Sequence, residues 1–407
     1  MKWLKYIYHP HSYIVFFVLI SVLAFIPNGL GWRHTMLGYT TEYFWLYVFY
    51  IFFYFLGYST SKSKVEFSAK EISLKTINLF HIIYFICALF FILKFVYIGG
   101  TPMFADSGHM RIRLAKLGGF VDFPTKAISL LGIVAYYFYL TRNNSLYLVQ
   151  FIISIALNIL FAERSPIVFT ILGAVILYVK HREISVKTFR KVVFSSMLLL
   201  FLIGWIQIRR HGGKDHLNKT KTMSTAEVVG WVIHGDLTGS QKFGAYTVNE
   251  LDGQKLYGKY TFGIYLSLFI PNYKDHGATY LQKEFNPKAR TAQSAAIPYS
   301  YYMDFGYFSL MLPFIIGYMS KKLYLKFRDS ASLFYKILYI AFFFNLLWSV
   351  RAGNFPVDPK LVYFVLVMIF IFNPQSKVKI NNQIIQLIRL LFLATLVLSV
   401  LALIIRW

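Results

Sequence analysis

The sequence predicts an all-α polytopic membrane protein, and three observations lead to this fold class. The 407-residue chain is 57% hydrophobic and only 14% charged. Apolar windows long enough to cross a bilayer core recur along most of its length. The long run from Arg209 to Tyr302 is mostly polar. Because a bilayer core accepts only helices or closed barrels, we expect that run to lie outside the lipid.

Windows of about 20 apolar residues predict about 11 transmembrane helices. They lie near residues 13–30, 42–58, 78–98, 125–140, 146–162, 165–179, 192–208, 301–319, 333–350, 360–373 and 384–405. The chain then divides into N-terminal transmembrane helices at 1–208, an extracytoplasmic loop or cap at 209–300, and C-terminal transmembrane helices at 301–407.

Basic residues in four short connections predict the orientation, because Lys and Arg in short loops mark the cytoplasmic side. These residues are Lys62, Lys64, Lys70 and Lys75; Lys180, Arg182, Lys187, Arg190 and Lys191; Lys321, Lys322, Lys326 and Arg328; and Lys377 and Lys379. All four connections fall on the same side as the N-terminus. We therefore expect a cytoplasmic N-terminus and a long loop on the opposite face.

The charge balance and the cysteine count narrow the class of partner. The formal net charge is +25, and in a membrane protein this favours anionic lipid head groups and phosphate-bearing substrates over nucleic acid. The single cysteine, Cys87, excludes a disulfide framework and a thiolate metal site. Almost no charge lies in mid-span, which argues against an ion-driven carrier. Lys94 is the main exception, and we expect it to snorkel toward the outer end of its helix.

The long loop has an uneven composition that predicts a folded cap with a cleft. Residues Ala226–Ile233 and Leu256–Pro271 are apolar enough to form short helices packed on the bundle. The segment His234–Gly253 between them is polar and rich in glycine. This pattern is not that of a disordered tether.

Soluble-enzyme signatures are absent from the sequence. It contains no phosphate-cradling glycine loop, no His-Glu-x-x-His, no cysteine pair, no Asp-x-Asp and no Gly-x-Ser-x-Gly. We therefore expect neither an ATP-driven nor a zinc-dependent enzyme, and no metal or cofactor.

Arginines at the outer ends of helices are the candidate pyrophosphate-binding residues. Guanidinium groups present a planar fork of donors that matches phosphate oxygens and stays charged beside lipid. The candidates are Arg111, Arg113, Arg164, Arg209, Arg290 and Arg351. For Arg209 and its neighbour Arg210, a simple stop signal at a helix end remains the alternative.

Arg164 is the most specific of these candidates. It lies with Glu163 in a short turn between two apolar helices, and Pro166 suits the first turn of the following helix. The N-terminus of that helix would also favour an anion. The alternative is that Glu163 and Arg164 only pair with each other and keep the turn soluble.

A transfer to a hydroxyl group also needs a base near the acceptor. Residue type and predicted face make His211, His234, Asp236 and Asp304 candidates, which complete a catalytic set with Arg164 and Arg210. Each of them alone has a surface or structural role as its alternative. The tyrosines around Asp304 would suit sugar stacking, although an interfacial aromatic belt explains them equally.

Four motifs, in order, resemble the O-antigen polymerase (Wzy) family of oligosaccharide repeat unit polymerases. They are Gly99-Gly100-Thr101-Pro102-Met103-Phe104 followed by Arg111; Glu163-Arg164-Ser165-Pro166; Tyr257-Gly258 leading to Phe269-Ile270-Pro271; and Tyr302-Met303-Asp304-Phe305-Gly306. The resemblance covers roughly residues 95 to 320, and its specificity comes from the order and placement of the motifs.

The resemblance implies a metal-independent glycosyltransferase with a GT-C-like fold in the bacterial cytoplasmic (inner) membrane. Its donor would be an oligosaccharide on undecaprenyl pyrophosphate, moved as a block onto another repeat unit of O-antigen or capsule. Chain-length regulator and flippase proteins would be its partners. A ligase-like glycan transferase and a non-enzymatic polysaccharide or lipid exporter remain the alternatives.

Overall fold

The computed structural model describes residues 6–26, 41–61, 72–103, 119–182, 224–269, 277–287, 294–352 and 359–372, with Phe355 and scattered positions at 185–201 and 386–399. Within these residues every regular element is a helix, which confirms the all-α class. The candidate residues Arg111, Arg113, Arg209, Arg210, His211 and Arg290 lie outside the described part of the chain.

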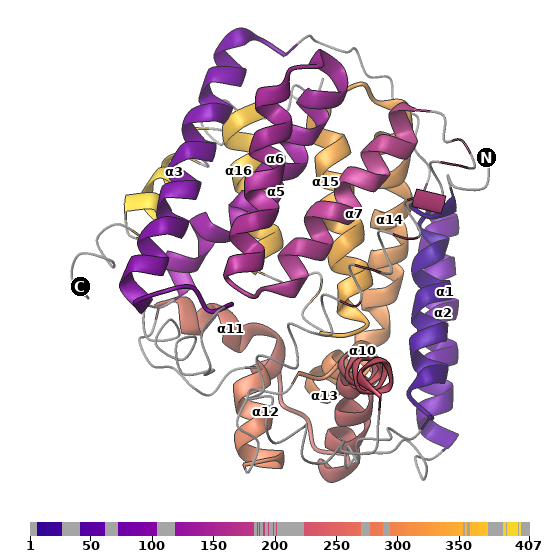
Figure 1. Cartoon of the computed structure of the whole chain (residues 1–407). Coiled ribbons are helices and arrows are strands. Elements are labelled where there is room, and N and C mark those ends of the chain that lie inside the picture. Colours follow the sequence, from indigo (N-terminus) through magenta and orange to yellow (C-terminus); the bar gives the residue numbers. More distant parts are fainter. Residues whose placement is uncertain are drawn as a thin grey trace.

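A bundle of long helices forms most of the described structure (Figure 1). Its members are α1 (His11–Leu23), α2 (Thr41–Thr60), α3 (Leu74–Ile98), α5 (Gly119–Arg142), α6 (Ser145–Leu160), α7 (Arg164–His181), α14 (Met311–Asp329), α15 (Leu333–Ser349) and α16 (Pro359–Phe372). Three stretches are long and apolar enough to cross a membrane: Leu74–Ile98, Phe123–Arg142 and Arg164–His181. Five further apolar helices in the described residues are shorter. These helices support a membrane protein, while the count of about 11 spans and the GT-C-like class stay predictions.

Four further helices lie across one end of this bundle (Figure 1). We call them the cap helices, and that end of the bundle the cap end. They are α10 (Thr225–Glu250), α11 (Lys259–Phe269), α12 (Gly277–Phe285) and α13 (Tyr299–Phe305). The helix α10 runs beneath the ends of α7 and α15, nearly perpendicular to them in Figure 1.

Polar side chains join α5, α6 and α7 inside the bundle. The buried face of α6 carries Gln150, Ser154 and Asn158, each one helical turn apart, while its exposed face is apolar. The amide of Asn158 donates to Ser129 Oγ of α5 at 3.2 Å. A Cβ at Gly132 of α5 would stand 2.8 Å from the Ser154 side chain. Small residues and interhelical hydrogen bonds of this kind are how helices associate in lipid, where apolar contact alone gives no preference.

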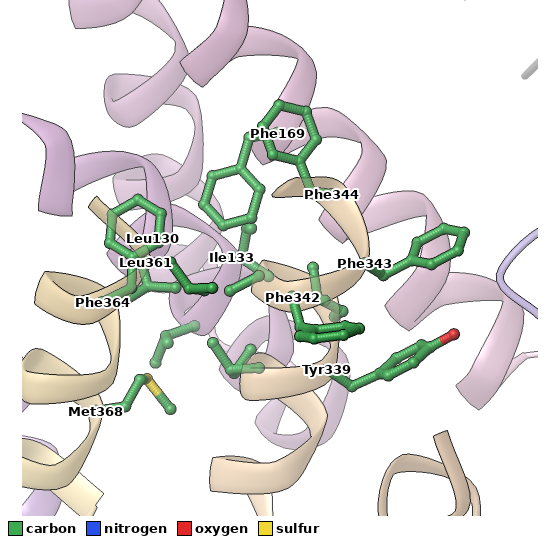
Figure 2. Packing of buried hydrophobic residues seen from close by; sticks show 14 of the residues in the cluster. Leu130, Ile133, Phe169, Tyr339, Phe342, Phe343, Phe344, Leu361, Phe364 and Met368 are labelled. Atoms are coloured by element: carbon green, nitrogen blue, oxygen red, sulfur yellow. The ribbon is translucent and has the colours of Figure 1, made fainter. Parts of the chain in front are cut away.

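Two glycines allow α2 and α14 to pack backbone against backbone. A Cβ at Gly57 would lie 1.9 Å from the carbonyl oxygen of Phe314, and one at Gly317 would lie 2.0 Å from that of Tyr54. No side chain fits at such distances, so the crossing requires glycine at both positions. Elsewhere aromatic residues fill the core, as Figure 2 shows for Phe169, Phe344 and Phe364.

The cap helices differ from the sequence-based expectation in two places. Residues His234–Glu250 are helical and continue the helix formed by the apolar residues before them. The result is one helix of 26 residues, and a capping box of Ser224 and Glu227 stabilises its start. The span expected at 301–319 is interrupted, because Gly306 has φ +58° and ends α13. A short 3₁₀ helix (Gly306–Leu310) follows, and the long helix α14 begins only at Met311.

Lys94 does not snorkel as expected. Its exposure is 2%, and its ammonium group lies 4.0 Å from the centroid of the Phe161 ring and 3.4 Å from Thr125 Oγ1. An aromatic face and a hydroxyl group therefore take the place of water around this charge.

Candidate functional site

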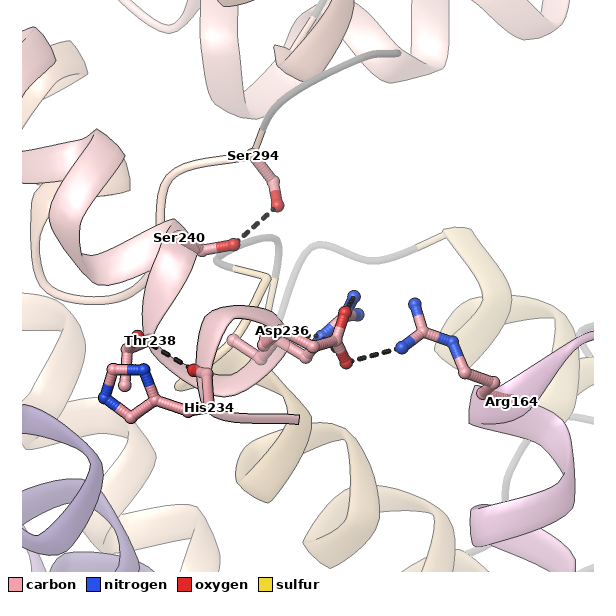
Figure 3. Close-up of polar contacts among 7 residues, drawn as sticks. Arg164, His234, Asp236, Thr238, Ser240 and Ser294 are labelled. Atoms are coloured by element: carbon pink, nitrogen blue, oxygen red, sulfur yellow. Dashed lines mark hydrogen bonds and ion pairs between the residues drawn. The ribbon is translucent and has the colours of Figure 1, made fainter. Parts of the chain in front are cut away.

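Asp236 of α10 brings together two arginines that come from distant parts of the chain. Its Oδ2 lies 2.7 Å from Arg164 Nη1. Arg351 binds the same carboxylate with two donors, Nη2 to Oδ1 at 2.6 Å and Nε to Oδ2 at 3.0 Å. Figure 3 shows the Arg164 side chain extending from α7 toward Asp236. The two guanidinium groups therefore share one carboxylate oxygen.

Local structure explains where each arginine side chain starts. Arg164 is the first residue of α7, and Glu163 occupies the preceding N-cap position. Arg351 follows the C-terminal turn of α15, and its guanidinium carbon lies 4.7 Å from the centroid of the Trp348 ring. Stacking on an aromatic face restricts the rotamers of an arginine and leaves its donor edges available. Arg351 is thereby directed toward α10, where its Nε also donates to the Asp236 carbonyl at 3.1 Å.

A set of hydrogen bonds holds α10 in place beneath the bundle. The side-chain amide of Gln241, which is fully buried, donates to the carbonyls of Ile297 and Val350 at 3.1 and 3.0 Å. Tyr47 of α2 donates to the Gln241 oxygen at 2.6 Å. Lys242 donates to the carbonyl of Ile26, just after α1, at 2.9 Å. The position of Asp236 is therefore set by contacts from several helices.

The electrostatics of Asp236 are a balance of two large effects. Burial alone would raise the pKa of its carboxyl group, since its side chain is only 14% exposed. The Arg351 and Arg164 guanidiniums outweigh burial and hold the pKa below its ordinary value. Both arginines therefore favour the ionised form of Asp236.

A cavity lies directly beside this cluster, between α5, α7, α15 and α16. It is a small hollow that opens to solvent, and its volume is about 30 Å³. Ser165 and Pro166, which follow Arg164, and Trp348, on which Arg351 stacks, line it together with Lys126, Ser129, Phe169, Phe344, Asn345, Lys360 and Phe364. Lys126 and Glu163 form an ion pair, and their side chains are 12% and 13% exposed.

The charges around this cavity give the site a positive balance. Lys126, Arg164, Arg351 and Lys360 contribute four positive charges, while Glu163 and Asp236 contribute two negative charges, which leaves a difference of two. Of these charged residues, Lys126 and Lys360 line the cavity itself, and Phe169, Phe344 and Phe364 form its aromatic lining. The cavity thus combines features for an anion with features for an apolar group.

Asp304, another candidate base, is bound to backbone groups. Its carboxylate accepts from the backbone N–H of Tyr260 at 3.1 Å and of Thr261 at 2.7 Å, in the first turn of α11. Its exposure is 1%. Burial raises the pKa of Asp304, and the hydrogen bonds from Thr261, Tyr260 and Gly258 oppose that effect. These contacts are those of a helix cap supplied from another helix.

His234 lies two residues before Asp236 on α10 and is turned toward α1. Its Nε2 is 3.0 Å from the carbonyl oxygen of Leu23, and its ring packs edge-on against Trp231. Burial lowers the pKa of His234, the Leu23 carbonyl opposes this shift, and Lys242 adds to it. The structure therefore brings together Arg164, Arg351 and Asp236, whereas His234 and Asp304 make separate contacts.

The sequence did not suggest three of the residues that surround the cavity. Lys126, Lys360 and Trp348 lie in apolar helices at positions that hydropathy alone would assign to spans. The signal for Lys126 was a basic residue near the predicted outer end of a span, the same signal that singled out the arginines. Within the described residues, no group of three or more His, Cys, Asp or Glu side chains is placed to hold a metal ion.

Comparison with known proteins identifies the family. No curated protein and no solved structure matches the chain. A family model described as "Putative O-antigen polymerase" matches residues 6–263, which is more than half of the chain and includes Arg164 and Asp236. This match confirms the resemblance that the sequence motifs indicated. The protein belongs to the O-antigen polymerase family.

Proposed function

We propose that this protein polymerises oligosaccharide repeat units carried on undecaprenyl pyrophosphate, and that Arg164 and Arg351 bind the pyrophosphate. The observation that carries the proposal is the convergence of both guanidiniums on one carboxylate. A carboxylate held by an arginine fork has the donor geometry that a phosphate group also requires. A phosphate group of the substrate would bind the donor edges of Arg164 and Arg351 that Asp236 occupies in this structure.

The cavity beside the arginines suits the rest of the donor head. With the pyrophosphate near Lys126, Lys360 and the two arginines, the aromatic side chains that line the hollow would contact the first isoprene unit of the carrier. Apolar burial of one isoprene unit contributes a few kcal/mol at about 0.8 kcal/mol per methylene-sized group. A nucleotide diphosphate carries no such apolar group, so the cavity favours a polyprenyl donor.

The proposed reaction needs no nucleotide, because the pyrophosphate itself is the leaving group. A hydroxyl of one repeat unit attacks the anomeric carbon of the oligosaccharide on a second carrier, and undecaprenyl pyrophosphate departs. Negative charge grows on the leaving group in the transition state, where Arg164 and Arg351 would stabilise it. The reaction would take place at the outer face of the cytoplasmic membrane, the face to which we assign the cap end.

Chain extension by protein reconstituted in liposomes tests the proposal. The wild-type protein should convert a lipid-linked repeat unit into a ladder of longer glycans. Arg164→Ala and Arg351→Ala should each reduce extension by about 100- to 1000-fold, the usual effect of removing one donor to a developing anion. Arg328→Ala is the matched control, because Arg328 is 54% exposed and pairs with Asp329, at the C-terminal end of α14.

Three results would contradict the proposal. A wild-type protein that moves lipid-linked glycan across the bilayer without forming a ladder would be an exporter. Full chain length in Arg164→Ala would remove this arginine from the site. Transfer of finished glycan to a different acceptor, with no ladder, would instead indicate the ligase-like alternative.

A further inference from the structure

The Asp236 carboxylate is surrounded by groups that a substrate anion would also seek. Its side-chain contacts in the described structure are with Arg164 of α7 and Arg351 after α15. The charged groups described on the neighbouring helices at this end of the bundle include the Lys126–Glu163 pair of α5 and α7 and Lys360 of α16. On α10 itself, His234 is turned away to the carbonyl of Leu23. A change in the protonation of Asp236 must therefore come through its two arginines.

A pyrophosphate and Asp236 would compete for the same donor edges. Arg351 presents Nε and Nη2 to the carboxylate, and Arg164 presents Nη1. A pyrophosphate carries more negative charge than one carboxylate and has several oxygens that can accept bidentate donors. When the donor substrate binds these edges, Asp236 loses the partners that now keep it ionised.

The surroundings of Asp236 would then favour a proton. Its side chain is 14% exposed, and burial has the largest single effect on the pKa of its carboxyl group, which it raises. With the guanidiniums turned to the pyrophosphate, burial and the nearby negative charge both raise the pKa of Asp236. The same carboxylate is a poor base while it is paired and a competent base once the donor has bound.

We propose that Asp236 is the general base of the transfer and that donor binding activates it by taking over Arg164 and Arg351. This inference rests on the proposed function. The hydroxyl oxygen of the acceptor forms a bond to the anomeric carbon as its proton passes to the Asp236 carboxylate. The bond from that carbon to the phosphate oxygen breaks, and its electron pair leaves with undecaprenyl pyrophosphate. The arginines hold the leaving group while the proton rests on Asp236.

This arrangement imposes an order on the reaction. Without donor, Asp236 stays bound to both arginines and cannot accept a proton from an acceptor hydroxyl. The acceptor is therefore activated only when a donor is in place.

The isosteric variant Asp236→Asn tests this role, with undecaprenyl pyrophosphate in nanodiscs as the binding probe. The variant should bind the probe as tightly as wild type or up to about tenfold more tightly, because the competing carboxylate charge is gone. Its chain extension should fall by at least about 100-fold, the usual contribution of a general base. Glu250→Gln, an exposed acid near the end of the same helix, is the matched control and should change neither quantity.

A pH profile adds a measurement that a purely structural residue would not change. Wild-type extension at saturating donor should fall as the pH drops through the pKa of the released carboxyl group. The residual activity of Asp236→Asn should lack this acidic limb. Asp236→Glu retains a carboxylate and should recover part of the rate, which guards against loss of activity through misfolding.

The outcomes separate this inference from the proposed function. Weaker probe binding in Asp236→Asn, at the level of Arg164→Ala, would mean that Asp236 only positions the arginines and would overturn the inference. Unchanged chain extension in Asp236→Asn would overturn it as well. A wild-type protein that neither binds undecaprenyl pyrophosphate nor forms a ladder would instead refute the proposed function itself.

Discussion

Asp236, which is partly buried, and Asp304, which is fully buried, come from two cap helices, and their surroundings differ in kind. Asp236 is bound by the guanidiniums of Arg164, at the start of α7, and Arg351, which follows α15. Asp304 is bound by backbone N–H groups of α11. The first set of partners consists of side chains beside a cavity, whereas the second is fixed in a helix. The two guanidiniums hold the pKa of Asp236 below its ordinary value, whereas burial outweighs the backbone hydrogen bonds of Asp304 and raises its pKa.

These two kinds of surroundings distinguish a binding site from a structural contact. Side-chain partners can rotate to another anion, and a neighbouring cavity gives that anion room. Backbone donors at a buried helix start cannot rotate and have no such room. Two residues of the same type can thus be assigned different roles from what surrounds them.

The largest expected effect is on stability, and added anion should distinguish the two aspartates. Asp236→Ala leaves the buried Arg164 and the partly buried Arg351 without their shared carboxylate, which costs about 3–5 kcal/mol. Asp304→Ala leaves two buried N–H groups without an acceptor, which costs about 2–4 kcal/mol. Inorganic pyrophosphate should restore the thermal midpoint of Asp236→Ala in detergent and leave that of Asp304→Ala unchanged. Equal rescue of both variants would show that pyrophosphate does not specifically replace the Asp236 carboxylate.

A smaller effect is expected from Arg351→Lys, which keeps the charge and removes the fork. A lysine ammonium cannot bind an anion with two parallel donors. It also lacks the planar group that stacks on Trp348. We expect about tenfold weaker binding of undecaprenyl pyrophosphate, which corresponds to about 1.4 kcal/mol. Binding isotherms in nanodiscs measure this change. Undiminished affinity would show that charge alone matters at this position.

The smallest expected effect is a difference in how stability depends on pH. Asp236 has a lowered pKa in the folded state, so its contribution is present above the unfolded pKa near 3.9 and is lost as the pH falls. Asp304 has a raised pKa, so its contribution is present below that value and is lost as the pH rises. The stability advantage of wild type over Asp236→Asn should therefore shrink on acidification, whereas that over Asp304→Asn should grow. Unfolding midpoints between about pH 3 and pH 7 give both slopes, and slopes of the same sign would contradict the assignment.

Much of the helical framework could be predicted, because hydropathy is a local property of the chain. The predicted spans at 146–162, 165–179, 333–350 and 360–373 agree with α6, α7, α15 and α16 within a few residues. The break at Gly306 was missed, since the apolar run continues through it and only the backbone conformation ends the helix. The burial of Lys94 was missed because snorkelling is the usual outcome for a lysine near a helix end.

The sequence by itself determined that this is a helical membrane protein with an arginine, Arg164, in a turn between two spans. Only the tertiary structure decided that Arg164 and Arg351 meet at Asp236, which is 115 residues from Arg351 along the chain. It also decided that Lys126, Lys360 and Trp348 surround a cavity beside them. The physical reason is that helix formation depends on neighbouring residues, whereas a charge cluster depends on how distant helices pack.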